Sequence, residues 1–321
     1  MNITVVLQQM VIIFILIGVG LLLYKKEMLS ENTGRQISGL IVNVTNPALL
    51  ICSAFREGPR VSLQELGMAL GIYLVVYILL IIAGLLIPRI LRVPNMYHYS
   101  YQMLTVFGNV GFIGIPLASA VLGAESLIFV SIYNLIFNIL IYTFGITLLQ
   151  KAEARQLAAG SSTAQRPGSG ITTPLWKKLV NAGTVSAAAT IIFYLGDFHV
   201  PALVSSTLNY MGQATTLLSM LVLGISLAQM KPKDIFSHPK LYGFTLLRQI
   251  LVPIGCILIL RPFIQNPLIL NTMALMLAVP AANMPLMLSK QLQVETDTIS
   301  QGIILTTILS LGTIPVVSLF L

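Results

Sequence analysis

Two apolar stretches of this chain are interrupted by glycine, proline and asparagine where a membrane helix would otherwise continue. They are residues 108–116, GNVGFIGIP, and residues 278–285, AVPAANMP. Proline removes one backbone donor and collides with the preceding turn, so neither stretch should form one straight helix. Unpaired backbone at membrane depth is tolerated only where it is buried in protein or lines a wet cavity. One such segment in each half of a chain indicates the binding site of a secondary transporter.

Each interrupted stretch should place two half-helices end to end near the bilayer centre. The half that begins after the break presents free N–H groups and a partial positive charge. Pro116 and Pro285 suit that first turn, where proline loses no hydrogen bond. Asn109 and Asn283 add amide groups, and two positive helix ends that meet favour an anion. The alternative is that the prolines only kink helices whose small residues pack against neighbours.

We therefore predict a substrate-binding site made from both breaks and from polar residues of other spans. The candidates are Asn109, Gly111, Pro116, Asn134, Asn138, Arg248, Pro280, Asn283 and Pro285, followed by Asn43, Asn46 and Tyr133. Asn134 and Asn138 are four residues apart and share a helix face. We favour cavity lining for that pair and helix packing for Asn43 and Asn46.

Arg248 is the only side chain charged at neutral pH in the interior of a predicted span. It lies roughly 10 Å deep at 1.5 Å of rise per residue. A charge inside the membrane predicts a functional site, but a long side chain can also extend back to the headgroups. All ten acidic residues fall in predicted loops or at span edges. A proton relay or a carboxylate-based cation site within the membrane is therefore disfavoured.

The composition is that of a polytopic membrane protein, with 56% hydrophobic and 9% charged residues. The mean hydropathy is +0.90. A crossing helix needs about 20 apolar residues. The qualifying windows are 3–23, 33–55, 64–87, 101–122, 125–149, 179–196, 202–229, 241–260, 267–289 and 297–321. Cys52 and Cys256 both fall within spans, which favours small buried side chains over a disulfide. No cleavable signal peptide is expected at the N-terminus.

The distribution of the net charge of +8 indicates topology rather than nucleic-acid binding. With the N-terminus outside, most Lys and Arg fall in cytoplasmic loops, and only Arg56, Arg60 and Arg261 fall in outer ones. By the positive-inside rule, both termini should lie outside. The polar, glycine-rich segment 150–178 is typical of a flexible linker and separates two halves of five spans. An odd number of spans per half gives the halves opposite orientations, as in an inverted repeat.

An ordered set of motifs resembles the auxin efflux carrier family over essentially the whole chain. The motifs are residues 108–116 with Leu117, Asn46-Pro47-Ala48-Leu49, Asn134 with Asn138, and the run from Pro280 through Pro285 to Thr306-Thr307 and Pro315. The short linker is similar to bacterial members rather than to plant auxin exporters.

The resemblance implies an all-α polytopic membrane protein related to the bile acid sodium symporter fold. Its ten transmembrane helices would form two inverted five-helix repeats, with helices four and nine broken and crossing. Residues 1–60 and 179–232 would form a scaffold that commonly mediates dimerisation. Residues 61–149 and 233–321 would form a transport domain, with 150–178 as the cytoplasmic linker. The substrate carboxylate would sit where the two broken helices cross.

The resemblance also implies a function. Bacterial relatives are associated with small organic anions such as malate and malonate. We expect a secondary transporter of mono- or dicarboxylates that works by elevator-type alternating access in the bacterial inner membrane. The alternative is a sodium-coupled symporter of larger amphipathic acids, such as bile acid-like or auxin-like compounds.

We predict no cofactor and no metal site. Coupling to a proton or sodium gradient stays open. Sodium coupling in particular is not established by the resemblance, because span nine lacks the acid that sodium-coupled relatives use. The expected partners are the small carboxylate, the lipid bilayer and a second copy of the chain in a homodimer, and not nucleic acid. An enzyme is disfavoured because no His or acidic residue for a catalytic set lies within a span.

The predicted topology can be tested by cysteine labelling in intact cells. With Cys52 and Cys256 replaced by serine, an impermeant maleimide should modify Arg60→Cys in an outer loop and spare Gln165→Cys in the linker. The expectation follows from the distribution of basic residues. Permeabilised cells are the control, since both positions should then react. Labelling of position 165 alone in intact cells would contradict the orientation.

Overall fold

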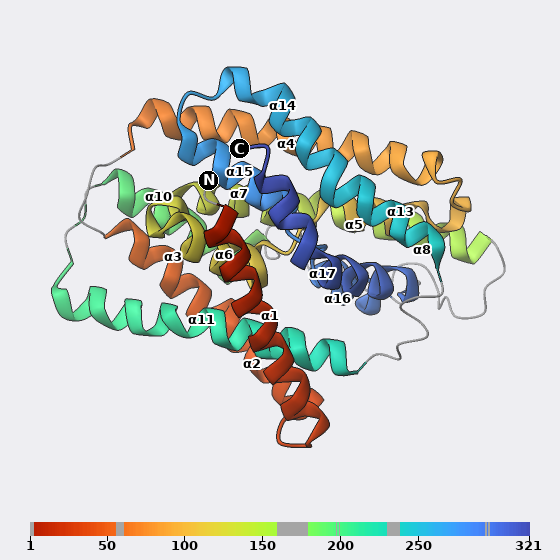
Figure 1. Ribbon diagram of the computed structural model, residues 1–321, viewed down its shortest axis with the longest axis horizontal. Helices are drawn as coiled ribbons and strands as arrows, with labels where there is room; N and C mark the ends of the chain where they lie inside the picture. Colours follow the sequence, from red (N-terminus) through yellow and green to blue (C-terminus); the bar gives the residue numbers. More distant parts are fainter. Residues whose placement is uncertain are drawn as a thin grey trace.

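The computed structural model describes residues 3–55, 61–158, 179–196, 198, 200–229, 238–292, 294 and 296–321. The secondary structure of these residues is helical, and no β-strand occurs among them. The α-helices are α1 (Ile3–Lys25), α2 (Glu31–Leu40), α3 (Asn46–Ala54), α4 (Leu63–Ile90), α5 (His98–Val106), α6 (Ile115–Leu122), α7 (Leu127–Leu140), α8 (Ile146–Ala158), α10 (Ala182–Leu195), α11 (Ala202–Ala228), α13 (Pro239–Leu246), α14 (Val252–Leu260), α15 (Pro267–Ala278), α16 (Met284–Gln291) and α17 (Asp297–Ser318) (Figure 1). The shorter elements are the π-helical turns η1 (Ile41–Thr45), η3 (Val110–Gly114), η5 (Ile141–Gly145) and η6 (Leu247–Leu251), and the 3-10 turns η2 (Asn95–Tyr97), η4 (Ala124–Ser126) and η7 (Arg261–Phe263).

Seven helical stretches of the described chain are long and apolar enough to cross a membrane. They are Ile3–Lys25, Glu31–Ala54, Leu63–Ile90, Ala124–Arg155, Ala202–Ala228, Pro239–Phe263 and Asp297–Ser318. Each matches one of the ten predicted windows. The other three windows contain the shorter apolar helices Val110–Leu122, Ala182–Leu195 and Pro267–Ala278. The expectation of a multi-pass, all-α membrane protein is therefore confirmed.

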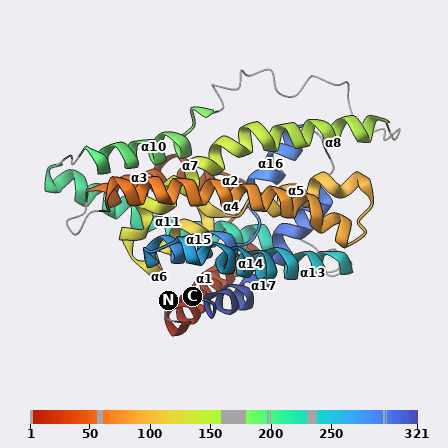
Figure 2. The ribbon, with the colours of Figure 1, turned by 90° about the horizontal axis from the view of Figure 1, so that it is seen from above.

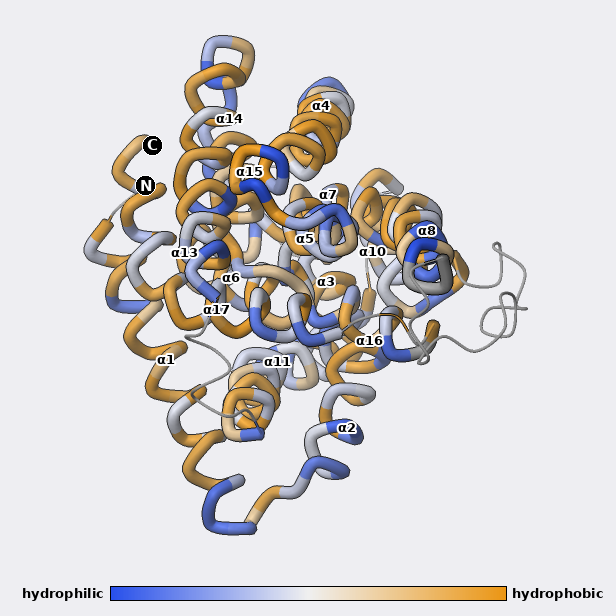
Figure 3. The backbone as a smooth tube through the Cα atoms, turned by 90° about the vertical axis from the view of Figure 1, so that its right-hand side faces the viewer, coloured by the Kyte–Doolittle hydropathy of each residue, from blue (hydrophilic) through white to orange (hydrophobic). Residues whose placement is uncertain are grey.

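The outer surface of the molecule is apolar along the helices. Hydrophilic residues gather at helix ends, such as the turn between α1 and α2 and the end of α8 (Figure 3). Large apolar side chains stay exposed in mid-helix, among them Ile15 of α1 at 61%, Ile78 of α4 and Leu258 of α14. In water such a surface would cause aggregation. Against lipid tails it is the expected outer face of a membrane bundle.

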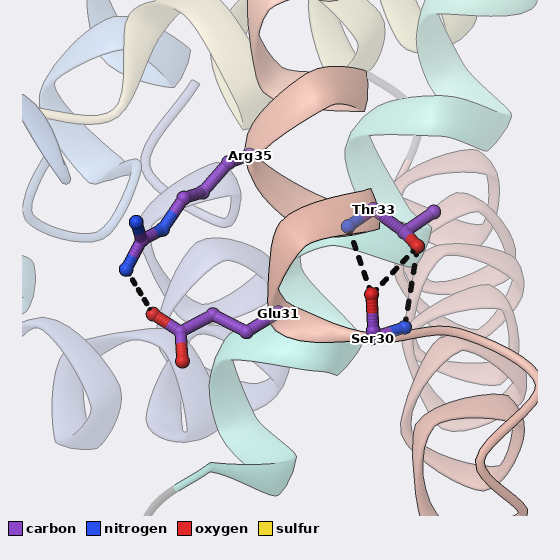
Figure 4. Close-up of polar contacts among 4 residues, drawn as sticks. All are labelled: Ser30, Glu31, Thr33 and Arg35. Carbon is purple, nitrogen blue, oxygen red and sulfur yellow. Dashed lines mark hydrogen bonds and ion pairs between the residues drawn. The ribbon is translucent and has the colours of Figure 1, made fainter.

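Polar caps define where two of the long spans begin. At the start of α2, the Ser30 hydroxyl accepts from the Thr33 amide at 3.1 Å, and the Thr33 hydroxyl accepts from the Ser30 amide at 3.3 Å (Figure 4). Glu31 and Arg35 form an ion pair on the next turn. Ser62 and Glu65 repeat the capping box at the start of α4. These side chains satisfy amide groups that a helix end leaves without partners.

Three of the four π-helical turns stand directly before a proline. Pro47, Pro116 and Pro253 lie in the first turn of α3, α6 and α14, after η1, η3 and η6. Proline has no N–H to continue the ladder, and its ring collides with a carbonyl of the preceding turn. The wider i→i−5 turn relieves this conflict and lets the helix continue. The helix therefore continues past each of these prolines.

The two predicted breaks are confirmed. The first interruption of the α-helix runs from the end of α5 at Val106, through residues 107–109 and the π-helical η3, to α6. The second separates the end of α15 at Ala278 from the start of α16 at Met284. Each break thus leaves two half-helices within one predicted span.

The start of the predicted linker is wrong. Helix α8 continues to Ala158, so residues 150–158 are helical. The sequence of residues 151–158, KAEARQLA, is rich in good helix formers, and its charges were mistaken for a loop signal. The remainder of the linker lies outside the described residues, as do positions 60 and 165 of the labelling experiment.

Helices α1 and α11 cross at very short distance, and α11 also packs on α2 and α3 (Figure 1). A Cβ atom added to Gly20 would lie 2.6 Å from the Leu221 carbonyl oxygen, and one added to Gly224 would lie 2.2 Å from the Ile17 carbonyl oxygen. Small residues allow this approach because van der Waals contact drives helix association in lipid. Helix α17 packs beside α1, so the two ends of the described chain are neighbours (Figures 1 and 2).

The close crossing predicts opposite effects for two glycines of one helix. Gly20→Ala should lower the melting temperature of the purified protein, because its methyl group meets rigid backbone; overpacking typically costs about 1–3 kcal/mol. Gly18→Ala is the matched control, since nothing lies within 4 Å of its added Cβ. Gly18→Ala should leave the melting temperature unchanged or raise it, because alanine has a higher helix propensity than glycine. Equal melting temperatures for both variants would contradict a tight crossing.

Candidate functional site

The two breaks pair with each other. Gly108 and Ala281 form an isolated antiparallel bridge. The Asn109 amide donates to the Pro280 carbonyl at 2.7 Å, and the Ala282 amide donates to the Phe107 carbonyl at 2.9 Å. Each break thereby satisfies backbone groups of the other, which the interior of a membrane protein requires. The pairing brings residues 107–109 and 280–282 into one place, called the crossover below.

Arg248 lies against the crossover. Its side chain is 1% exposed, and its Nη1 atom donates to the Leu277 carbonyl at 3.0 Å and to the Val279 carbonyl. A Cβ atom at Gly108 would lie 2.9 Å from its Nη2 atom, so the other break touches the same guanidinium. The alternative in which Arg248 extends to the headgroups does not hold, because the side chain is enclosed by protein.

The positive charge of Arg248 has no carboxylate partner in the described part of the chain, where the one ion pair is that of Glu31 with Arg35. Its Nε atom is buried without a hydrogen-bond partner. The ionisable side chains close enough to act on it are the phenols of Tyr77 and Tyr133, and phenols are uncharged at pH 7. A buried charge is costly unless it is paired and hydrogen-bonded. The crossover therefore carries a net positive charge that only backbone dipoles partly offset.

Two asparagine side chains bind consecutive residues of the first break. The Asn109 Oδ1 atom accepts from the Phe112 amide at 3.1 Å, which caps η3. The Asn46 Nδ2 atom, from the start of α3, donates to the Gly111 carbonyl at 3.0 Å. Each asparagine then keeps one buried atom without a partner, Nδ2 of Asn109 and Oδ1 of Asn46. Such atoms in a native site indicate a ligand or water that completes them.

A threonine of the last helix supports the second break. The Thr306 hydroxyl of α17 accepts from the Ala281 amide at 3.2 Å. The Thr306 carbonyl accepts from Nε2 of Gln249 at 3.0 Å, and the Gln249 Oε1 atom is buried without a partner. Sequence reasoning missed Gln249. The signal was present, since an adjacent Arg-Gln pair is unusual within an apolar span.

The remaining residues of the second break contribute a backbone hydrogen bond and a buried proline rather than side-chain hydrogen bonds. Pro280 supplies the carbonyl that pairs with Asn109. Asn283 precedes α16 without a side-chain capping bond and is partly exposed, and Pro285 is buried in the first turn of α16. Pro116 is buried in the first turn of α6. The half-helix α16 thus has proline in its first turn, as predicted, whereas the half-helix after the first break begins at Val110 of η3, six residues before Pro116.

Several other candidates lie in different surroundings. Nδ2 of Asn138 donates to the Asn134 carbonyl at 2.8 Å, and a Cβ atom at Gly183 of α10 would lie 3.1 Å from the Asn138 amide. Asn138 thus contributes to the contact between α7 and α10. Tyr133 is buried with its ring centre 5.4 Å from that of Tyr73 and 4.9 Å from that of Tyr77.

Asn43 is exposed and donates to the Gly39 carbonyl of its own helix at 2.8 Å. Helix packing was favoured for this residue and for Asn46. The Asn46 side chain instead reaches the first break.

Helix α11 adds polar groups that sequence reasoning missed. The hydroxyls of Thr215 and Ser219 are buried without partners, as is that of Thr45 in η1. Helix α11 contacts both η1 and η3, so these hydroxyls belong to the elements that surround the first break. Thr215 and Ser219 are four residues apart and lie on one face of α11, and that spacing was the available signal.

Comparison with known proteins agrees with these observations. A family model described as "Membrane transport protein" matches residues 5–318. The chain belongs to the auxin efflux carrier family. It is also 24% identical over 307 residues to the "Uncharacterized transporter MJ1031" of Methanocaldococcus jannaschii, with 94% of each chain covered. This auxin efflux carrier family member is thus a membrane transport protein, and its family consists of transporters rather than enzymes.

Two adjacent threonines of α17 provide a matched test of the hydrogen bond that supports the second break. Thr306→Val should lower the melting temperature, because the buried Ala281 amide loses its acceptor at a typical cost of about 1–3 kcal/mol. Thr307→Val is the control, since the Thr307 hydroxyl bonds only to the Ile303 carbonyl of its own helix. Differential scanning fluorimetry of both variants is the measurement. Equal losses would mean that Thr306 does not support the second break.

Proposed function

We propose that this protein is a secondary transporter of small organic anions, mono- or dicarboxylates such as malate or malonate. The supporting observation is the buried guanidinium of Arg248, which has no carboxylate partner among the described residues. It lies where two broken helices meet. An anion would offset this charge and would gain more from it than it could in water, because the interior has a low dielectric constant.

The donors around the first break support the same class of substrate. Nδ2 of Asn109 is an unpartnered donor at the crossover, and the hydroxyls of Thr215 and Ser219 stand on α11, which contacts η3. Hydroxyl and amide groups are ligands of carboxylate oxygens. We propose that the carboxylate binds at Asn109 and that α11 contacts the rest of the substrate, which would set the accepted length.

The proposed mechanism is elevator-type alternating access in a fold of two inverted five-helix repeats. Helices α1, α2, α3, α10 and α11 would form the scaffold, with residues 1–60 and 179–232. Residues 61–149 and 233–321 would form the moving transport domain with the crossover. Two observations support the division. Helix α11 makes extensive contacts with α1 and α3, and both breaks pair within the proposed transport domain.

The proposed setting is the inner membrane of a bacterium, with both termini outside and dimerisation through the scaffold. The distribution of Lys and Arg supports the orientation. Neighbouring positions of the two chain ends support a common side for both termini.

The proposed site can be tested with purified protein. A thermal-shift screen of C2 to C6 mono- and dicarboxylates selects the anion, and calorimetry then measures its dissociation constant. Asn109→Ala should weaken binding roughly 10- to 100-fold, because a hydrogen bond to a charged group contributes about 1.5–3 kcal/mol. Asn109→Asp should weaken it further by repulsion between carboxylates. Asn43→Ala is the control, since that amide is exposed and bonds to its own helix.

Two outcomes would contradict the proposal. One is an Asn109→Asp variant that binds the anion as tightly as the wild type. The other is a protein that none of the carboxylates stabilises. Uptake of the selected anion into proteoliposomes, with an imposed membrane potential or ion gradient, then tests transport itself.

A further inference from the structure

The C-terminal end of α15 presents carbonyl oxygens in the interior of the protein. The helix ends at Ala278, and Val279 adopts an extended conformation, with φ −58° and ψ 147°. The last carbonyls of a helix lack intrahelical partners and carry a partial negative charge. The Pro280 carbonyl is satisfied by Asn109 at 2.7 Å. The carbonyls of Leu277 and Val279 both point to a single group, the Nη1 atom of Arg248.

Carbonyl oxygens in this arrangement are ligands for a hard cation. In transporters with broken helices, unwound carbonyls and the C-terminal ends of half-helices coordinate the coupling Na⁺ or H⁺. Oxygen ligands are also what hard metal ions prefer. Here a nitrogen atom of the chain itself stands in that position, and it brings its own positive charge. A metal ion beside the guanidinium would meet repulsion.

The surroundings fit the guanidinium and not an additional cation. Gly108 leaves room for the Nη2 atom, where a Cβ atom would come within 2.9 Å. In the described part of the chain, no three His, Cys, Asp or Glu residues gather as a metal-binding group. Arg248 and Gly108 therefore complement each other across the two breaks.

We propose that Arg248 is a tethered cation that takes the place of a coupling ion. It neutralises the end of α15 and holds the crossover in the geometry that binds an anion, so the transporter works without sodium. This inference rests on the proposed function, because it concerns whether transport at the same site is coupled to sodium. It makes the positive charge at the crossover permanent, whereas a sodium-coupled carrier has that charge only when the ion is bound.

The experiment compares cation effects on the melting temperature of purified protein, with no organic anion present. Wild type should melt at the same temperature in choline chloride and in sodium chloride of equal ionic strength. Arg248→Ala and Arg248→Gln should melt lower in choline chloride, because the α15 carbonyls lose their cation. Sodium, lithium or low-millimolar guanidinium should then raise their melting temperature saturably, by roughly 2–4 °C or more. Arg248→Lys, which keeps a cation, should remain insensitive to sodium.

Arg89→Ala is the matched control. Arg89 also donates to a backbone carbonyl, that of Leu85, but at an exposed position of α4, so its loss should create no sodium response. The inference is overturned if sodium stabilises the wild type relative to choline. It is equally overturned if the folded Arg248→Ala or Arg248→Gln variant responds to none of the three cations. The comparison of the wild-type protein in sodium chloride and in choline chloride tests the inference even if a variant does not fold. Because no carboxylate is used, these outcomes are independent of whether Asn109 binds one.

Discussion

The structure depends on one constraint, which is that backbone polar groups inside a membrane protein must find partners within the protein. The breaks in the helices leave amide and carbonyl groups that no helical ladder can use. At the crossover they pair with each other, through Asn109 with Pro280 and Ala282 with Phe107. The Gly111 carbonyl is bound by the side chain of Asn46, the carbonyls of Leu277 and Val279 by that of Arg248, and the Ala281 amide by that of Thr306. Spans distant in sequence are therefore held at one place by hydrogen bonds that water cannot replace.

This arrangement also determines the electrostatics. Two half-helices begin at the breaks with their positive ends, and the guanidinium that satisfies the end of α15 adds a full charge. In the described residues no carboxylate balances it. The same groups that stabilise the fold thus leave a positive site, completed by unpartnered donors on Asn109 and α11. This unbalanced positive charge is the feature of the structure that supports the proposed anionic substrate.

The closest helix crossing and the irregular helical turns lie in different helices. The glycine contacts at the crossing of α1 and α11 bring backbone against backbone, which resists sliding. Three helices instead contain π-helical turns before proline, at Pro47, Pro116 and Pro253. Such turns lack the regular ladder and are frequent at functional sites. Two of them adjoin residues that bind the two breaks, since η1 ends beside Asn46, which binds Gly111, and η6 contains Arg248, which binds Val279.

Composition, hydropathy and the placement of proline and glycine predict the membrane class, the seven helices long enough to cross a membrane and the positions of both breaks. Hydropathy, proline and glycine act locally, so their effects can be read without knowing the fold. The sequence did not determine the end of α8, because the charged residues after position 150 are also good helix formers.

What each polar side chain contacts depends on how the helices pack, and the sequence alone does not show it. Depth alone could not say whether Arg248 reaches headgroups or carbonyls, because that depends on which span lies behind it. Helical spacing put Asn134 and Asn138 on one face, but the packing of α10 decided that Asn138 lies against Gly183. The sequence offers a signal for Thr215, Ser219 and Gln249, but only the packing shows that their polar atoms are buried without partners.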